Sequence, residues 1–224
     1  MDFEILYEDK YLILVNKPCG VISQDADGEC MPKFIKEKLG LDYIGVVHRL
    51  DTTTSGIIMY SKDKRYTGKL SELVANGEYY KEYLAVCDGE VAFDECEKNA
   101  SGMVTLHDFL YHDKMKNKAF VVKGERKGAK AAALEYKTLA TAKNARAEMK
   151  SLVSVHLLTG RTHQIRVQFG SRGHALAGDG KYGSRDNGCF AALHSCKCAF
   201  VHPILNKKIE VECKPNNTYP WNLF

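Results

Sequence analysis

From residue 79 onwards, the sequence is dominated by stretches with β-strand character, and this pattern limits the possible folds most strongly. Apolar residues at every second position, as at Val153, Val155 and Leu157, are typical of a half-buried strand. Strands that follow one another without alternating helices predict an α+β fold with a large, mostly antiparallel sheet. We expect strands at 79–87, 102–111, 119–123, 132–138, 147–158, 189–201 and 207–213, the last two as an antiparallel pair.

The first part of the chain predicts strands and helices together. Strands are expected at 3–7, 11–16 and 57–61. A short helix at 32–39 should end at Gly40, and a second helix at 63–76 should end at Gly77. The apolar face of the second helix would carry Tyr66, Leu70, Leu73 and Val74.

Residues 162–172 fit two interpretations. Ile165, Val167 and Phe169 alternate as in a strand, whereas Thr162 could cap a helix that Gly173 ends. We favour the helix.

The composition indicates a globular protein of the cytoplasm. The chain has 224 residues, of which 45% are apolar, so a sizeable core can form. It contains no apolar run long enough to cross a membrane, and its acidic N-terminus does not resemble a signal peptide. The eight cysteines are therefore expected to be reduced thiols. Without linkers or repeats, one continuous domain over residues 1–224 is predicted.

Two stretches of the chain are rich in bases although the net charge is only +4. Residues 112–130 contain seven Lys and Arg against two acids, and residues 161–185 contain five bases. Such stretches suit a polyanion bound on one face, although for any single stretch a solvated surface is the favoured interpretation.

The segment His48-Arg49-Leu50-Asp51-Thr52-Thr53-Thr54-Ser55-Gly56 places a carboxylate close to a fixed cation. Asp and Thr form turns, and Gly56 can supply a positive φ, so a plain turn is one interpretation. The other is a nucleophile, because Asp is ionised at neutral pH and needs no partner base. Arg49 could then anchor a phosphate or the carboxylate itself.

Four further segments have candidate functions. Arg161 and Arg166, near the start of the ambiguous segment, could bind a carboxylate or phosphate through two hydrogen bonds, or form a surface ion pair. Tyr83 could stack on a base or lie in the core. The glycine-rich segment 178–183 is interpreted as a turn rather than a phosphate loop. His194, Cys196 and Cys198 could be imagined as zinc ligands, but paired C-x-x-C spacing is absent and core cysteines are favoured.

Together, and in this order, these segments resemble the RluA-type pseudouridine synthases, over nearly the whole chain. The segments at 48–56 and 160–167 are the most specific. The matching segments are His48-Arg49-Leu50-Asp51 with Thr54-Ser55-Gly56, Lys81-x-Tyr83-Leu84-Ala85, Gly160 to Val167, Gly178-Asp179-x-x-Tyr182-Gly183, Leu193-His194 with His202-Pro203, and Asn16-Lys17-Pro18-x-Gly20.

The resemblance implies the pseudouridine synthase catalytic fold, in which a long, mixed but mainly antiparallel sheet is flanked by helices and loops and carries a central active-site cleft. It implies that uridine is isomerised to pseudouridine in structured RNA, ribosomal RNA being favoured over transfer RNA, with no cofactor and no metal. We also expect a monomer without an obligatory protein partner. The extra N-terminal RNA-binding module of several relatives is not expected here.

The resemblance also assigns roles to individual residues. Asp51 corresponds to the essential aspartate, Tyr83 to the tyrosine that packs on the target base, and Arg166 to the arginine that pairs with the aspartate. Contacts to RNA are expected from His48, Arg49, Thr54, Arg161, His163, Gln164 and Lys181. The rival interpretations are a catalytically silent RNA-binding protein on the same fold and a zinc-dependent nucleic-acid hydrolase.

Overall fold

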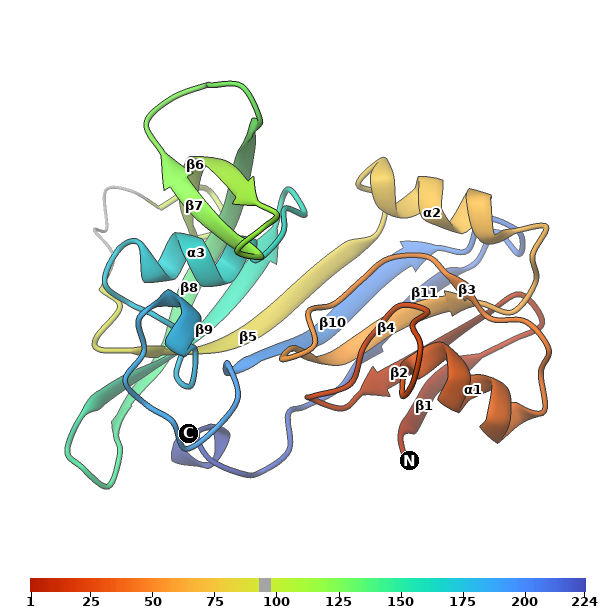
Figure 1. Cartoon of the computed structure of the whole chain (residues 1–224), viewed down its shortest axis with the longest axis horizontal. Helices are drawn as coiled ribbons and strands as arrows, with labels where there is room; N and C mark the ends of the chain where they lie inside the picture. The colour runs from red at the N-terminus through yellow and green to blue at the C-terminus, as the bar shows by residue number, and fades with distance from the viewer. Residues whose placement is uncertain (93–97) are drawn as a thin grey trace. The chain divides into compact units, whose positions relative to one another are not determined.

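The computed structural model describes residues 1–92 and 98–224, which form two compact units (Figure 1). Unit 1 comprises Met1–Lys81 and His194–Pro215, and unit 2 comprises Glu82–Leu193 and Asn216–Phe224. The chain passes between the units at residues 81–82, 193–194 and 215–216, so each unit is built from two separate segments. The single domain expected over residues 1–224 stays a prediction.

Unit 1 contains a mixed sheet with the strand order β1-β2-β4-β10-β11. Strands β4 and β10 run parallel, and the neighbouring pairs β1–β2, β2–β4 and β10–β11 are antiparallel. The short strand β3 also pairs with β4. The strands are β1 (Glu4–Glu8), β2 (Leu12–Lys17), β3 (Gly45–Val46), β4 (Ser55–Ser61), β10 (Leu193–Val201) and β11 (Lys208–Glu212).

Two helices complete unit 1. Helix α1 (Met31–Leu39) ends at Gly40 as predicted, since Gly40 adopts the left-handed conformation with φ 64°. Helix α2 (Thr67–Ala75) buries Leu70 and Leu73 against the apolar residues of β2, β4 and β10, which confirms the predicted face. Its predicted start at residue 63 was wrong, because the Asp63 carboxylate accepts the N–H of Arg65 in a tight turn instead.

Unit 2 contains an antiparallel sheet with the strand order β5-β9-β8-β6-β7. Strand β8 is the longest, at 15 residues, and extends beyond the predicted range at both ends. A register shift between Thr138 and Ala140 interrupts its pairing with β9. The strands are β5 (Tyr80–Asp88), β6 (Val104–Asp113), β7 (Lys118–Val122), β8 (Ala129–Lys143) and β9 (Met149–Leu157).

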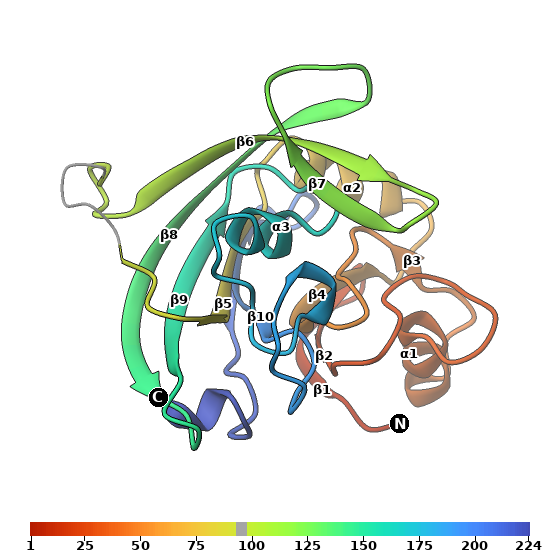
Figure 2. The same ribbon diagram turned by 60° about the vertical axis from the view of Figure 1, so that its left-hand side comes forward.

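Helix α3 (Gln164–Gly170) lies against β6 and β7 (Figure 2), so the helix was the right choice for this segment. Its residues from Gln164 to Phe169 are all buried, which explains why its apolar residues do not form the usual one-sided helical pattern. The expected cap at Thr162 was wrong: His163, with φ 53°, precedes the helix and makes no side-chain cap. Two short 3₁₀ turns, η2 (Gly180–Tyr182) and η3 (Trp221–Leu223), also belong to unit 2.

The predicted α+β class with a mixed, mainly antiparallel sheet is confirmed by these elements. The predicted pair near the C-terminus is present as β10 and β11. The seven cysteines in the described part of the chain are all thiols. No helix among the described residues is both long and apolar enough to span a membrane.

Candidate active site

Asp51 lies in a tight turn that leads into β4 of unit 1. The Asp51 carbonyl accepts the N–H of Thr54 at 3.0 Å, and the Thr54 side chain is buried. Two residues later, Gly56 has φ 103°, and a Cβ there would lie 2.2 Å from the carbonyl oxygen of Ser195. Glycine is therefore required where β4 meets β10, and this close approach fixes the end of the Asp51 turn.

A buried lysine supports the Asp51 turn from within unit 1. Lys17 is fully buried, and its ammonium donates to the carbonyl oxygens of Pro18 and Val21 at 2.9 Å each and of Thr52 at 3.3 Å. Burial lowers the pKa of Lys17 to about 8, and the neighbouring Cys19 and Asp51 partly oppose that shift. The ammonium thus joins the segment after β2 to the Asp51 turn and places a cation near the carboxylate.

Arg49 and His48 precede Asp51 but have different surroundings. Arg49 is exposed, and its Nη1 donates to the side-chain oxygen of Gln24 at 3.1 Å. The Nε2 of His48 accepts the N–H of Met59 at 3.1 Å. Burial, assisted by the charge of Lys81, lowers the pKa of His48 to about 3. His48 is therefore a neutral group that supports β4, while Arg49 is exposed to solvent.

In unit 2, Arg166 forms a buried ion pair with Asp179. The Nε of Arg166 lies 2.6 Å from Oδ2 of Asp179, and Nη2 lies 2.8 Å from Oδ1. The two side chains are 7% and 1% exposed. Two parallel hydrogen bonds of this kind fix the plane of a guanidinium. Helix α3 thus presents Arg166 in one defined orientation.

Tyr182 in η2 joins α3 to the edge of the sheet in unit 2. Its hydroxyl accepts the N–H of Ala119 at 2.8 Å and lies 2.8 Å from Nδ1 of His163. The guanidinium carbon of Arg166 is 5.2 Å from the centre of the Tyr182 ring, which is a cation–π distance. The buried His163 therefore helps to position the ring that lies against Arg166.

The turn before α3 is built around the side chain of Gln164. Its Oε1 accepts the Thr159 hydroxyl at 2.8 Å and the N–H of Arg161 at 2.9 Å, and its Nε2 donates to Ala133 at 3.0 Å. The exposed Arg161 uses its Nε to bind the carbonyl of Ala131 at 2.9 Å. Gln164 thus has a structural task, whereas Arg161 is accessible to a ligand.

The two remaining candidates in unit 2 are a buried aromatic and an exposed cation. Tyr83 lies on β5 opposite Val155 of β9 and is 6% exposed. Lys181 is exposed and donates to the carbonyl of Asn117 at 3.0 Å. Of the ten residues expected in the site, Asp51, His48, Arg49 and Thr54 belong to unit 1 and Tyr83, Arg161, His163, Gln164, Arg166 and Lys181 to unit 2.

The residues imagined as zinc ligands have other contacts. Nδ1 of His194 lies 2.9 Å from the Ser55 hydroxyl, and Nε2 lies 3.3 Å from Sγ of Cys213. Cys198 belongs to the apolar core of unit 1. Within residues 1–92 and 98–224, no three His, Cys, Asp or Glu residues are arranged to hold a metal ion together.

Sequence reasoning missed two residues of this arrangement, Lys17 and Asp179. Both lie in segments that carry the family resemblance, so the signal was present in the sequence. Lys17 looked like part of a strand end, and Asp179 looked like part of a glycine-rich turn. Only the fold shows that one is buried under the Asp51 turn and the other holds Arg166.

Comparison with known proteins gives a consistent set of relatives. The sequence profile described as RNA pseudouridylate synthase matches residues 11–171. The RNA pseudouridine synthase YlyB of Bacillus subtilis, which is named as uncharacterised, is 31% identical over 95% of this chain and 69% of its own length. The ribosomal large subunit pseudouridine synthase D of Zymomonas mobilis is 29% identical over 94% and 68%. The dual-specificity RNA pseudouridine synthase RluA of Yersinia pestis is 27% identical over 94% and 98%.

A solved structure shows the same fold. The human RNA pseudouridylate synthase domain containing 1 matches 98% of this chain and 85% of its own chain, with a TM-score of 0.80 and 22% sequence identity.

Proposed function

Because this chain belongs to the RNA pseudouridylate synthase family and is therefore an isomerase that acts on RNA, we propose that Asp51 is its catalytic carboxylate. In the proposal, Tyr83 packs on the target base and Arg166 pairs with Asp51. The observation that carries it is that each charged group is held in a fixed position within its own unit. The Asp51 turn is held by Lys17 and Gly56, and the Arg166 guanidinium is held by Asp179.

The reaction exchanges one glycosidic bond for another. The bond between N1 of uracil and C1′ breaks, the base rotates, and a bond between C5 and C1′ forms; C5 loses its proton and N1 gains one. Since the base is inaccessible within a stack, the uridine must first be flipped out, at a cost of a few kcal/mol. An ionised Asp51 can attack C1′, attack C6, or remove a sugar proton to give a glycal-like intermediate. All three routes need the same carboxylate.

The geometry of Arg166 suits a partner of Asp51. A guanidinium offers five N–H donors, and Asp179 binds the edge formed by Nε and Nη2. Guanidinium groups can bind carboxylates along more than one edge, each through a pair of N–H donors. An arginine cation held in this way would attract and orient the Asp51 carboxylate.

The names of the relatives guide the choice of RNA. The proteins of Zymomonas mobilis and of Buchnera aphidicola are named for the large ribosomal subunit, and that of Yersinia pestis for dual specificity. We therefore propose structured RNA as substrate, with ribosomal RNA favoured and transfer RNA as the alternative. Arg49 and Arg161 are exposed and are proposed to bind its phosphates.

The replacement Asp51→Asn tests the proposal directly. The substrate is total RNA from the source organism lacking this gene, labelled with tritium at uridine C5, because that hydrogen leaves when C5 joins C1′. We expect the parent protein to release tritium and the variant to release none, with RNA affinity nearly unchanged. Asp42→Asn, at an exposed position of the same unit, is the matched control and should keep full activity.

Two results would contradict the proposal in different ways. Full activity of the Asp51→Asn protein would show that another group carries the chemistry. Tight RNA binding by a parent protein that releases no tritium from any RNA would instead indicate a silent RNA-binding protein.

A further inference from the structure

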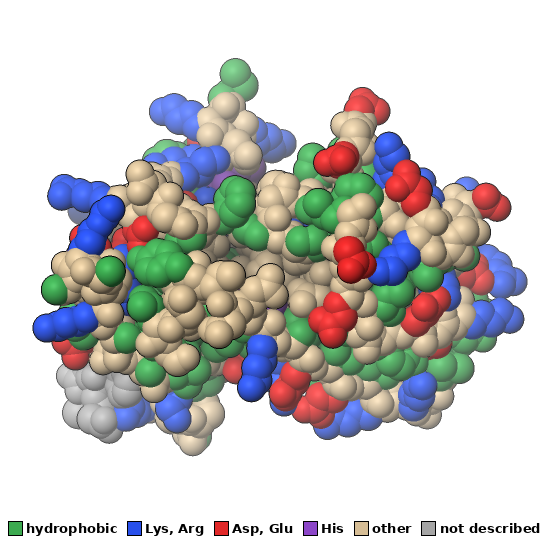
Figure 3. Space-filling model, turned by 90° about the horizontal axis from the view of Figure 1, so that it is seen from below, with side chains coloured by type: hydrophobic (Ala, Val, Ile, Leu, Met, Phe, Trp, Pro, Cys, Tyr) green, Lys and Arg blue, Asp and Glu red, His purple; other side chains and the backbone are tan. Residues whose placement is uncertain are grey.

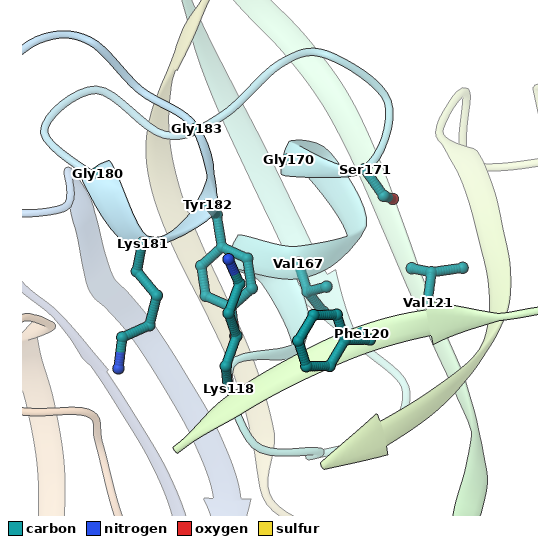
Figure 4. A pocket seen from close by; sticks show the side chains of 10 residues that line it. All are labelled: Lys118, Phe120, Val121, Val167, Gly170, Ser171, Gly180, Lys181, Tyr182 and Gly183. Carbon is teal, nitrogen blue, oxygen red and sulfur yellow. The ribbon is translucent and has the colours of Figure 1, made fainter. Parts of the chain in front are cut away.

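Unit 2 contains a pocket that none of the roles above explains. It has a volume of about 440 Å³ and lies between β7, α3 and η2 (Figure 4). That volume is in the usual range for sites that hold a small organic group. Val167 and Val121 give it an apolar floor, and the Tyr182 ring gives it a wall.

The pocket combines aromatic rings with cations. The ammonium of Lys118 lies 5.3 Å from the ring centre of Tyr182 and 5.7 Å from that of Phe120. Lys181 stands at the same mouth, and its ammonium is held by the carbonyl of Asn117. Among the described residues that line the pocket, none is acidic. Its chemistry therefore matches a flat group that carries a negative charge.

One ring of the pocket is held in place and the other is accessible to solvent. The Tyr182 ring is held through its hydroxyl by His163 and Ala119. Phe120, in contrast, is 37% exposed, although it is a large apolar residue on a strand. A phenyl ring that is accessible beside a cation is a platform on which a base can stack.

The surrounding surface favours RNA over a free anion. The hairpin of β6 and β7 and the turn that follows carry exposed Lys and Arg residues. Lys and Arg side chains also project from the left-hand margin of the molecule in Figure 3. Phosphates of a nucleic acid are bound by such a surface largely without regard to sequence. These residues are Lys114, Lys116, Lys123, Arg126 and Lys127, and Lys130 at the start of β8 is exposed as well.

We infer that this pocket binds one nucleotide of the RNA substrate other than the target uridine, with its base on Phe120 and its phosphate on Lys118 and Lys181. The inference rests on the proposed function for the presence of RNA. The Tyr182 ring contacts both Arg166 and Lys118, so the pocket adjoins Arg166. A nucleotide bound there would give the RNA a second point of attachment to unit 2. The pocket would therefore select substrates whose chain continues past the modified position in a splayed, single-stranded form.

Binding of a defined probe by the full chain tests this inference. The parent carries Asp51→Asn so that RNA is not turned over, and the probe is a fluorescein-labelled oligouridylate of about ten nucleotides, compared with an abasic strand of the same length. Phe120→Ala should weaken oligouridylate binding by roughly tenfold and leave the abasic strand nearly unaffected, as expected for lost stacking. Lys118→Gln should weaken both strands and lower the slope of log affinity against log salt by about 1.

Matched variants on the same sheet separate the pocket from general effects. Leu139→Ala removes an exposed apolar side chain of β8, and Lys143→Gln removes an exposed charge of β8, and neither residue lines the pocket. Both should bind oligouridylate within about twofold of the parent. Thermal melting shows whether each variant is folded. If a Phe120→Ala protein melts at a lower temperature, Phe120→Leu, which keeps the apolar packing, replaces it and should show the same weakening.

Three results would overturn the inference. The first is that the Phe120 and Lys118 variants bind oligouridylate as the parent does. The second is that the control variants weaken binding equally. The third is competition by uridine monophosphate at micromolar concentration, which would indicate a free-nucleotide site. None of these measurements depends on turnover. Absence of tritium release by the protein with Asp51 intact would reject the proposed function alone.

Discussion

The guanidinium of Arg166 and the carboxylate of Asp179 form a two-point ion pair inside unit 2, with N–O distances of 2.6 and 2.8 Å. Both side chains are almost fully removed from solvent. A buried pair of this kind need not stabilise a fold more than apolar residues would, but the loss of one partner is costly. Asp179 is therefore as important for the position of Arg166 as the helix that carries it.

The replacement Asp179→Asn should strongly destabilise the protein. It keeps the shape of the side chain but leaves the charge of Arg166 buried without its counter-ion, at a cost of about 3–5 kcal/mol in the free energy of unfolding. Urea denaturation measures this cost. Asp63→Asn, which removes the partner of the exposed Arg65, should change little because water screens that pair. Equal effects of the two replacements would show that burial does not set the cost.

Lys17 should give the protein a stability that rises with pH in the alkaline range. Its pKa is about 8 in the folded protein, against 10.5 for an ordinary lysine, so the unfolded chain binds more protons between these values. The contribution is absent below pH 8 and fully present above 10.5, and its size is on the order of 3 kcal/mol. The difference in unfolding free energy between the parent protein and Lys17→Met, measured by urea denaturation from pH 7 to 10.5, isolates it. A constant difference across that range would show that Lys17 is not desolvated.

Gly56 should not tolerate a side chain. Alanine at this position meets the backbone of Ser195 and must also adopt φ 103°, so we expect Gly56→Ala to lower the free energy of unfolding by more than about 1 kcal/mol. Gly68→Ala is the contrasting replacement, since Gly68 lies in α2 with open space around it. That change should stabilise the protein by about 0.5–1 kcal/mol. Chemical denaturation of the two variants side by side provides the measurement.

The Tyr182 hydroxyl should contribute more to the stability of the fold than the hydroxyl of a tyrosine nearer the surface. In Tyr182→Phe, the N–H of Ala119 and the Nδ1 of His163 lose their partner inside the protein, which costs about 1–3 kcal/mol. In Tyr43→Phe, the Thr67 hydroxyl still binds the carbonyl of Asp63, so a smaller loss is expected. Thermal unfolding of both variants would reveal the difference, and equal losses would argue against a buried network at Tyr182.

Most of the elements could be predicted because their signals are local. The alternation at Val153, Val155 and Leu157 appears as β9, and Gly40 ends α1 as its freedom at positive φ predicts. The start of α2 could not be predicted in this way. It depends on the hydrogen bond between the Asp63 carboxylate and the N–H of Arg65, which competes with a helical turn.

The candidate residues could be named from the sequence, but their partners could not. Arg166 was recognised from its motif. Its ion pair with Asp179 depends on how the chain folds back after α3, so that the residue before η2 lies beside the helix. His48 and Gln164 were expected to contact RNA. The structure instead gives each a backbone partner, the N–H of Met59 and the carbonyl of Ala133, which only the folded chain brings near. Their contact with RNA stays a prediction.

The parallel contact of β4 with β10 has a consequence for the order in which the protein is made. Ser55 is in contact with His194, 139 residues further along the chain. At about 5–20 residues per second, a ribosome needs on the order of ten seconds to produce that interval. During this time the backbone of Ser195, against which Gly56 packs, has not been made, so the turn that carries Asp51 stays incomplete. A nascent chain would thus complete the Asp51 turn only after Ser195 has left the ribosome.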